Sequence, residues 1–307
     1  MKTKPKASYR IRNWNAYDAA LKQRGSITFW VSEAVIEQWH NDQKTGKRGA
    51  SYYYSDLAIA TMGTLASVFH LAGRQTEGVL ESRFVLMGIS LAVPDHSTLS
   101  RRLAKLTVEL PVVPKAATVH IVVDSTGVKV YGEGEWKTRQ HGVSKRRTWR
   151  KLHLGVDEQT GEIHAAIVST NNYQDGQLLE ELLEGVAAEI EQVSGDGAYD
   201  QRDCYETIEQ RQAKAVIPPR KDAKIWQHGN TKAPAHPREQ NLRRIRRVGR
   251  KRWKQESGYH RRSIAETTMF RLKTIFGDKV RSRRFERQAV ELFLQCAALN
   301  RMIQQCK

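Results

Sequence analysis

The chain has 307 residues and a formal net charge of +18, with 39% hydrophobic and 27% charged residues. This composition is typical of a globular protein of one large or two ordinary domains, and the positive charge predicts a polyanionic partner, either nucleic acid or a membrane surface. The longest mostly apolar run, residues 57–69, is too short to span a bilayer, which leaves nucleic acid. The three cysteines form no C-x-x-C pair and indicate reduced thiols in a cytosolic protein.

The first 50 residues are polar, with scattered aromatic side chains and three lysines around Pro5. This composition predicts a flexible, basic, tryptophan-containing arm over residues 1–50. Within it, Ser32 precedes a short apolar pattern that ends at Trp39, which predicts one short helix with a serine cap.

Residues 51–114 are predicted to form a helical domain that ends in a proline-containing linker. Ser55 or Asp56 can cap a first helix over residues 57–71. A second helix follows over residues 75–87, so two short helices stand before a turn.

A third helix is predicted to open at Asp95, and its outer face carries Arg101, Arg102 and Lys105. Two short helices, a turn and a third helix with a basic face indicate a helix-turn-helix that binds DNA. An ordinary helical bundle with solvated arginines is the alternative.

From Val119 the apolar period changes from that of helices to that of strands. A buried strand is predicted to end at Asp124, a hairpin follows over residues 149–170, and a short strand leads to Asp196. Helices separate the later strands, so the order is three strands, a helix, then strand, helix, strand and a final helix. This is the order of the RNase H-like fold. We therefore expect residues 115–307 to form an α/β domain with a mixed five-stranded sheet and flanking helices.

Two basic runs interrupt this domain. Residues 137–151 include Arg146 and Arg147. Residues 220–258 are predicted to be a basic loop insertion that includes Arg243, Arg244, Arg246 and Arg247. Basic loops with aromatic neighbours suit contact with DNA phosphates and bases, and a solvated mobile insertion is the alternative.

The stretch over residues 259–273 is predicted to be one helix. Four of its polar residues recur at helical spacing and fall roughly on one stripe: Tyr259, Arg262, Glu266 and Lys273. A solvated helix face is the alternative. Apolar residues away from the stripe can face a core.

Asp124 and Asp196 at strand ends, with Glu266 on a helix, are what a two-metal phosphoryl-transfer site needs. The reason is that hard divalent cations prefer carboxylate oxygens on rigid elements. Each acid also has an ordinary alternative, because aspartate is common in turns. Asp200 is a close competitor of Asp196, whereas Asp175 reads as the start of a helix.

The motifs around these acids resemble one known family. Tyr259-x2-Arg262-x3-Glu266-x6-Lys273 resembles the Y-R-E-K signature of bacterial insertion-sequence transposases. Asp124-Ser-Thr and Asp196-Gly-Ala-Tyr resemble the two regions that carry that family's aspartates. The chain is similar to a DDE transposase of the insertion-sequence family 5, 903 group.

The resemblance implies a transposase that binds the terminal inverted repeats of its element, cleaves the DNA at the ends and joins the 3′ ends to target DNA. It implies two Mg²⁺ ions, with Mn²⁺ as a substitute, on Asp124, Asp196 and Glu266, and DNA contacts by the other three residues of the signature. We also expect at least a dimer on DNA, at the nucleoid in the bacterial cytoplasm and not at a membrane. A nuclease of the same fold that cuts without rejoining and a non-catalytic DNA-binding repressor are the alternatives.

Overall fold

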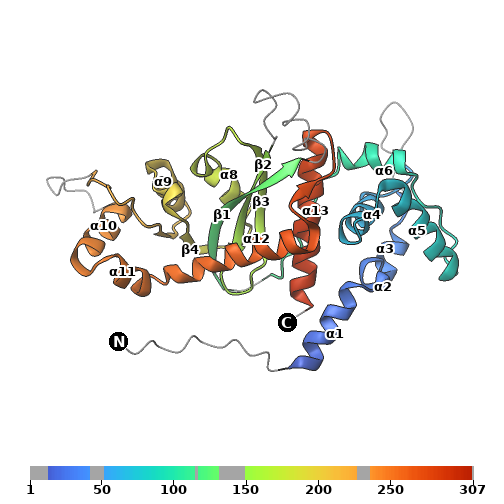
Figure 1. Ribbon diagram of the computed structural model, residues 1–307, viewed down its shortest axis with the longest axis horizontal. Coiled ribbons are helices and arrows are strands. Elements are labelled where there is room, and N and C mark those ends of the chain that lie inside the picture. The colour runs from blue at the N-terminus through green and yellow to red at the C-terminus, as the bar shows by residue number, and fades with distance from the viewer. Residues whose placement is uncertain (1–12, 42–51, 115–116, 131–148, 227–235, 306–307) are drawn as a thin grey trace, which may run out of the picture.

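The computed structural model describes residues 13–41, 52–114, 117–130, 149–226 and 236–305. Its centre is a six-stranded sheet of order β3-β2-β1-β4-β5, with β6 paired to the far end of β1 (Figure 1). The strands are β1 (Val119–Val130), β2 (Trp149–Asp157), β3 (Ile163–Thr170), β4 (Ile190–Ser194), β5 (Lys214–Val216) and β6 (Lys279–Val280).

Helices precede the sheet, separate its later strands and close the chain. Those before the sheet are α1 (Trp14–Arg24), α2 (Ile27–Trp30), α3 (Glu33–Glu37), α4 (Asp56–Val68), α5 (Gly73–Leu86) and α6 (His96–Leu103). Those among the strands are the 3₁₀ turns η1 (Asp175–Leu178) and η2 (Gly197–Tyr199), with α8 (Leu179–Glu184) and α9 (Arg202–Gln210). Those that follow β5 are α10 (Pro237–Val248), α11 (Arg250–Glu256), the 3₁₀ turn η3 (Tyr259–Arg262), α12 (Ser263–Phe276) and α13 (Phe285–Gln304).

The directions of the strands match the expected architecture. β2 runs antiparallel to β1 and β3, whereas β4 is parallel to β1 and β5 is parallel to β4. The sheet is therefore mixed, with helices flanking it, in the strand order of the RNase H-like fold. The sixth strand, β6, was not predicted and lengthens the sheet beside the end of β1.

Alternation along β1 divides its apolar side chains between two cores, because successive side chains of a strand point to opposite faces. Val119, Ile121 and Val123 pack with residues of α8 and α9. Val122 and Val128 pack with residues of α12 and α13. Helices therefore cover both faces of the sheet, and α12 crosses the strands in Figure 1.

The segment over residues 13–41 is not the arm predicted from the sequence. It forms three helices, and Trp30 and Trp39 are fully buried. The indole N–H of Trp39 donates to the carbonyl of Ala92 at 2.8 Å, and that of Trp30 donates to the carbonyl of Arg24 at 3.0 Å. Because large aromatic rings contribute heavily to core packing, these tryptophans fix the segment to the body. Residues 1–12 lie outside the described residues.

The predicted helical region is present and shares its core with the sheet. Ser55 caps α4 by accepting the N–H of Ala58 at 3.1 Å, and Asp95 caps α6. Gly63 of α4 lies so close to α13 that an added Cβ would come within 2.6 Å of Leu294. One cluster of buried residues continues from Trp30 through α4 to β2 and α13. The helices before the sheet therefore share one continuous core with the α12 and α13 side of the sheet.

No single helix in the described part of the chain is long and apolar enough to cross a bilayer. α4 and α5 reach the required length and composition only as a pair, and they are bent by 110° at the break between them.

The basic insertion predicted as a loop is helical over residues 237–256. Pro237 stands in the first turn of α10, where its missing N–H costs no hydrogen bond. Gly249, with φ of +84°, allows the sharp turn from α10 into α11. Trp253 of α11 is buried against Val216 at the end of β5. The insertion is therefore packed onto the sheet domain; residues 227–235 lie outside the described residues.

Candidate active site

Asp124 lies in the middle of β1. The sequence had predicted that the strand ends at this residue. Its Cα pairs with that of Leu154 on β2, and β1 continues to Val130. Pairing between β1 and β4 ends at Val122, opposite Ser194. Asp124 therefore stands two residues beyond the point at which β1 and β4 separate.

Asp196 stands two residues beyond the same point on the neighbouring strand. Ser194 is the last residue of β4, and Asp196 then caps η2 by accepting the N–H of Ala198 at 2.8 Å. Because β1 and β4 are parallel, equal steps past their last pair bring Asp124 and Asp196 to the same edge of the sheet.

Arg262 connects Asp124 with Glu266, the acid on α12. Its Nη1 donates to Oδ2 of Asp124 at 3.1 Å, and its Nη2 donates to Oε1 of Glu266 at 2.5 Å. The guanidinium and the Asp124 side chain are each less than one-fifth exposed, whereas the Glu266 side chain is 57% exposed. One cation thus stands between two of the three acids.

Asp196 and Glu266 are both near enough to Asp124 for their charges to act on the pKa of its carboxyl group. Burial raises this pKa, and the charges of Asp196 and Glu266 raise it further, against the lowering effects of the Ser125 N–H and Arg262. Like charges raise a carboxyl pKa in this way only when they are near. The three predicted acids therefore gather at one edge of the sheet.

The residue chemistry at this edge fits a divalent metal. Three carboxylates on separate rigid elements are the donor set that hard cations prefer. Tyr199 is 1% exposed, and its hydroxyl has no hydrogen-bond partner among the described residues. Burial raises the pKa of Tyr199, as do the nearby acids Asp175, Asp124 and Asp196. Tyr199 itself packs in the core on the α8 and α9 side of the sheet, so the three carboxylates are the donor set for an ion.

The side chains as they stand do not yet form such a site. Within the described ranges, no three acidic, histidine or cysteine side chains are already arranged to hold an ion. Arg262 explains this arrangement, because its guanidinium occupies the space between Asp124 and Glu266. An ion held by both Asp124 and Glu266 would take the place of this guanidinium, so Arg262 would have to release at least one of them.

The remaining signature residues differ in accessibility. Tyr259 belongs to the 3₁₀ turn η3, which leads into α12, and not to one continuous α-helix over residues 259–273; Gly258, with φ of +70°, separates η3 from α11. Tyr259 is 9% exposed and its ring packs 5.9 Å from the ring of Trp253, so it offers no free face for the predicted contact with DNA. Lys273, seven residues after Glu266 on α12, is partly exposed.

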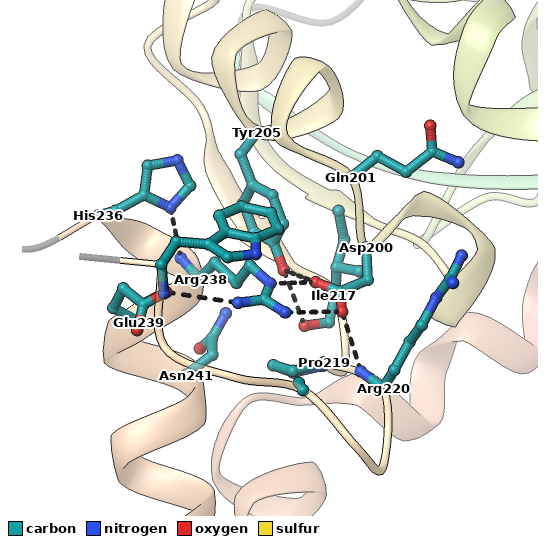
Figure 2. A network of polar contacts seen from close by, with 12 residues as sticks. Asp200, Gln201, Tyr205, Ile217, Pro219, Arg220, His236, Arg238, Glu239 and Asn241 are labelled. Atoms are coloured by element: carbon teal, nitrogen blue, oxygen red, sulfur yellow. Dashed lines mark hydrogen bonds and ion pairs between the residues drawn. The ribbon is translucent and has the colours of Figure 1, made fainter. Parts of the chain in front are cut away.

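Asp200, the competitor of Asp196, is committed to a buried ion-pair network (Figure 2). Its carboxylate accepts a hydrogen bond from Nε of Arg238 at 2.7 Å and another from the backbone N–H of Arg220 at 2.9 Å. Arg238 is 4% exposed, lies 3.7 Å above the ring of Trp226 and donates to the carbonyl of Lys224. The network connects α10 to the turn that follows Asp196. No local sequence signal distinguishes Arg238 from the basic residues after it.

A second polar cluster that the sequence did not single out lies beside Asp124. Ser125 donates to Oδ1 of Asp175 at 2.8 Å, and Lys151 donates to the same oxygen at 2.8 Å. Asp175, interpreted from the sequence as the start of a helix, therefore also holds the residue next to Asp124. The alternation of β1 could have indicated that Ser125 and Asp124 face opposite sides of the sheet.

The predicted basic face of α6 is only partly available. Arg101 and Lys105 are exposed, but Arg102 is 7% exposed. Arg102 donates to the carbonyl of Tyr54 at 2.8 Å and pairs with Asp56. The assignment of Arg102 to DNA contact is therefore corrected: its partners lie just before α4 and at its first residue, far away in sequence, and they hold it inside the fold.

The predicted DNA-contact residues of the insertion lie on the outside of α10. Four arginines there are exposed: Arg243, Arg244, Arg246 and Arg247. Arg244 is engaged by Glu256 of α11 at 2.9 Å. Arg146 and Arg147 lie outside the described residues.

Two protein-family models, both described as the transposase DDE domain, match the chain. One matches residues 22–133 and the other matches residues 115–301. Among solved structures, the chain is similar to the piggyBac transposase in its synaptic complex with hairpin DNA, at 11% identity and a TM-score of 0.39, covering 90% of this chain and 73% of that one. It is also similar to the Drosophila P element transposase in its strand transfer complex, at 10% identity and a TM-score of 0.31, covering 89% of this chain and 85% of that one. The second domain model spans more than half of the chain and includes all three acids. The chain therefore belongs to the family of transposases with a DDE domain.

Proposed function

We propose that this protein is the transposase of a bacterial insertion sequence of family 5, 903 group. It binds the terminal inverted repeats of its element, cleaves the phosphodiester at the ends and joins the 3′ ends to target DNA. The observation that carries the proposal is the gathering of Asp124, Asp196 and Glu266 at one edge of the sheet, with Arg262 among them. The match to the transposase DDE domain over residues 115–301 supports it.

Asp124, Asp196 and Glu266 would hold two Mg²⁺ ions, or Mn²⁺ as a substitute, with Asp124 between the two positions. Oxygen ligands favour these hard ions over softer metals. Such ions would activate a water or a 3′-hydroxyl for attack on phosphorus and would neutralise charge on the leaving oxygen.

Arg262 has two roles in this proposal. In the protein without DNA, its guanidinium keeps the repelling carboxylates of Asp124 and Glu266 together. When DNA arrives, a phosphate offers the guanidinium an equivalent bidentate partner, so Arg262 can leave the acids and neutralise the backbone beside the scissile bond. Lys273 would contact a further phosphate. Tyr259 supports Arg262 from within the core, since the guanidinium lies 5.8 Å from its ring.

DNA contact away from the active site is assigned to the basic surfaces. Arg101 on α6 and Lys105 just after it would contact the inverted repeats in a helix-turn-helix arrangement, and the exposed arginines of α10 would contact flanking or target DNA. Transposition holds two element ends and a target together, so the active assembly is at least a dimer on DNA. We place its activity at the nucleoid in the bacterial cytoplasm.

A strand-transfer assay tests this function against its alternatives. The purified protein is incubated with Mg²⁺, labelled DNA ending in the inverted repeat, and a supercoiled target plasmid. The proposal expects cuts at the repeat boundary and covalent joining of the labelled 3′ end to the plasmid. Cutting without joining would indicate a nuclease, and binding without either reaction would indicate a repressor.

A further inference from the structure

A hollow of about 550 Å³ lies between α6, the start of α13 and the segment that precedes α4. It contains none of the three acids, so it is separate from the candidate active site. Tyrosines form part of its wall, and basic side chains in and beside α6 and α13 form most of the rest. None of the described residues that line it is acidic.

The first ring in this hollow is held in place by a buried cation. The guanidinium of Arg102 lies 3.9 Å from the centre of the Tyr52 ring. Arg102 is itself fixed by the carbonyl of Tyr54 and by Asp56. Tyr52 nevertheless remains 44% exposed. Arg102 therefore supports an accessible aromatic surface instead of contacting a ligand itself.

The second ring is equally well supported. Tyr53 is 60% exposed, although its ring lies 5.0 Å from that of Tyr54 and 4.3 Å from that of His40. The Tyr54 hydroxyl donates to the carbonyl of Val93 at 3.1 Å, which fixes the supporting ring. Aromatic side chains that are already ordered lose little conformational entropy when they bind a partner.

Cations surround the two rings. Arg101, Lys105 and Arg284 are exposed. Arg287 donates to the Ser100 hydroxyl at 2.6 Å, while its buried Nε has no hydrogen-bond partner among the described residues. Concentrated positive charge of this kind attracts the phosphates of a nucleic acid.

We infer that this hollow binds an unpaired nucleotide of DNA, with its base stacked on Tyr52 or Tyr53 and its phosphates at the surrounding arginines and lysine. The volume lies within the roughly 300–1,000 Å³ of small-molecule sites. Bases within a duplex are stacked on one another and cannot enter, whereas an unpaired base presents its face to aromatic side chains. The inference rests on the proposed function, in which DNA ends are the substrate and their opened strands supply such nucleotides.

Binding of two labelled oligonucleotides by the full chain tests the inference. One is a run of eight thymidines, and the other has the same backbone with abasic sites. Because stacking of one base on an aromatic ring changes affinity by about 5- to 150-fold, wild-type protein should bind the thymidine run roughly tenfold more tightly in fluorescence anisotropy.

The double variant Tyr52→Leu/Tyr53→Leu should lose most of this preference and keep its affinity for the abasic strand. Tyr17→Leu alters a tyrosine of α1 that is 38% exposed and should keep the preference, so it is the matched control. Both tyrosines of the hollow are exposed, so the variant is expected to fold, which thermal unfolding checks. A preference that survives in the double variant, or equal binding of both strands by wild type, would overturn the inference; equal binding would show that phosphates alone are held.

The two hypotheses fail in different ways. Strand transfer by wild-type protein without any base preference would refute the nucleotide site and leave the proposed function intact. A base preference that depends on the two tyrosines, without strand transfer, would do the reverse.

Discussion

Replacing Arg238 by Met removes the cation from two buried acids at once. Arg238 pairs with Asp200 at 2.7 Å and with Glu239 at 3.3 Å, and all three side chains are no more than 4% exposed. Removing one partner of a buried ion pair costs about 3–5 kcal/mol, because it leaves an uncompensated charge in the interior. The contact with Trp226 at 3.7 Å is lost as well. We therefore expect Arg238→Met to lower the free energy of unfolding by about 4 kcal/mol.

Urea unfolding followed by circular dichroism measures this loss as a lower midpoint at unchanged slope. Arg243→Met on the same helix alters an exposed arginine and should change stability by no more than about 0.5 kcal/mol. Adding Asp200→Asn to Arg238→Met should recover part of the loss, because one of the two stranded charges is then removed. A loss below about 1 kcal/mol for Arg238→Met would refute this reasoning, since a pair worth so little would be a solvated one.

Three further predictions concern binding, pH and assembly. Arg101→Ala should weaken binding of inverted-repeat DNA and reduce the salt dependence of that binding by about one phosphate contact. Arg102→Ala should leave this salt dependence unchanged and should lower the free energy of unfolding by roughly 2 kcal/mol. Burial lowers the pKa of His153 to about 4 from 6.5, so the unfolded chain binds a proton below pH 6.5 that the folded chain binds only near pH 4. Stability should therefore fall by about 2 kcal/mol from pH 7 to pH 5, and urea unfolding of His153→Gln should show a smaller fall; equal falls would contradict the assignment. The exposed basic residues of α10 and α11 should repel those of a second copy, so light scattering should show a monomer or weak dimer without DNA and a larger complex with end DNA. A tight, salt-insensitive dimer of the free protein would contradict this prediction.

The sheet and most helices could be predicted from the sequence because their apolar periods are local signals. The length of β1 could not be predicted in this way. Residues 125–129 pair with β2, and the far end pairs with Lys279 and Val280, about 150 residues later, so Asp124 lies within a strand instead of at its end. The helices over residues 237–256 were missed because Gly229, Pro234 and Pro237 were interpreted as loop signals, although Pro237 is compatible with the first turn of a helix.

The acids of the candidate site could be identified because their motifs are short and specific, but their partners could not. Arg262 was expected to face DNA, and only the fold shows that it stands between Asp124 and Glu266. Arg102 and Tyr259 have the residue types of DNA contacts, yet both are buried. Arg102 is held by Tyr54 and Asp56, and Tyr259 packs with Val216 and Trp253. Burial of this kind is a tertiary property that no local pattern carries.

The most direct test of the account is cleavage of inverted-repeat DNA by wild-type protein and by Asp124→Asn, with and without Mg²⁺. Asp222→Asn, which alters an exposed aspartate, is the control. The account predicts Mg²⁺-dependent cuts at the element ends by wild type and Asp222→Asn. It predicts that Asp124→Asn binds the same DNA with nearly unchanged affinity and loses cleavage by about a thousandfold or more, since a metal ligand would be lost. Cleavage by Asp124→Asn at the wild-type rate would contradict the assignment of the active site.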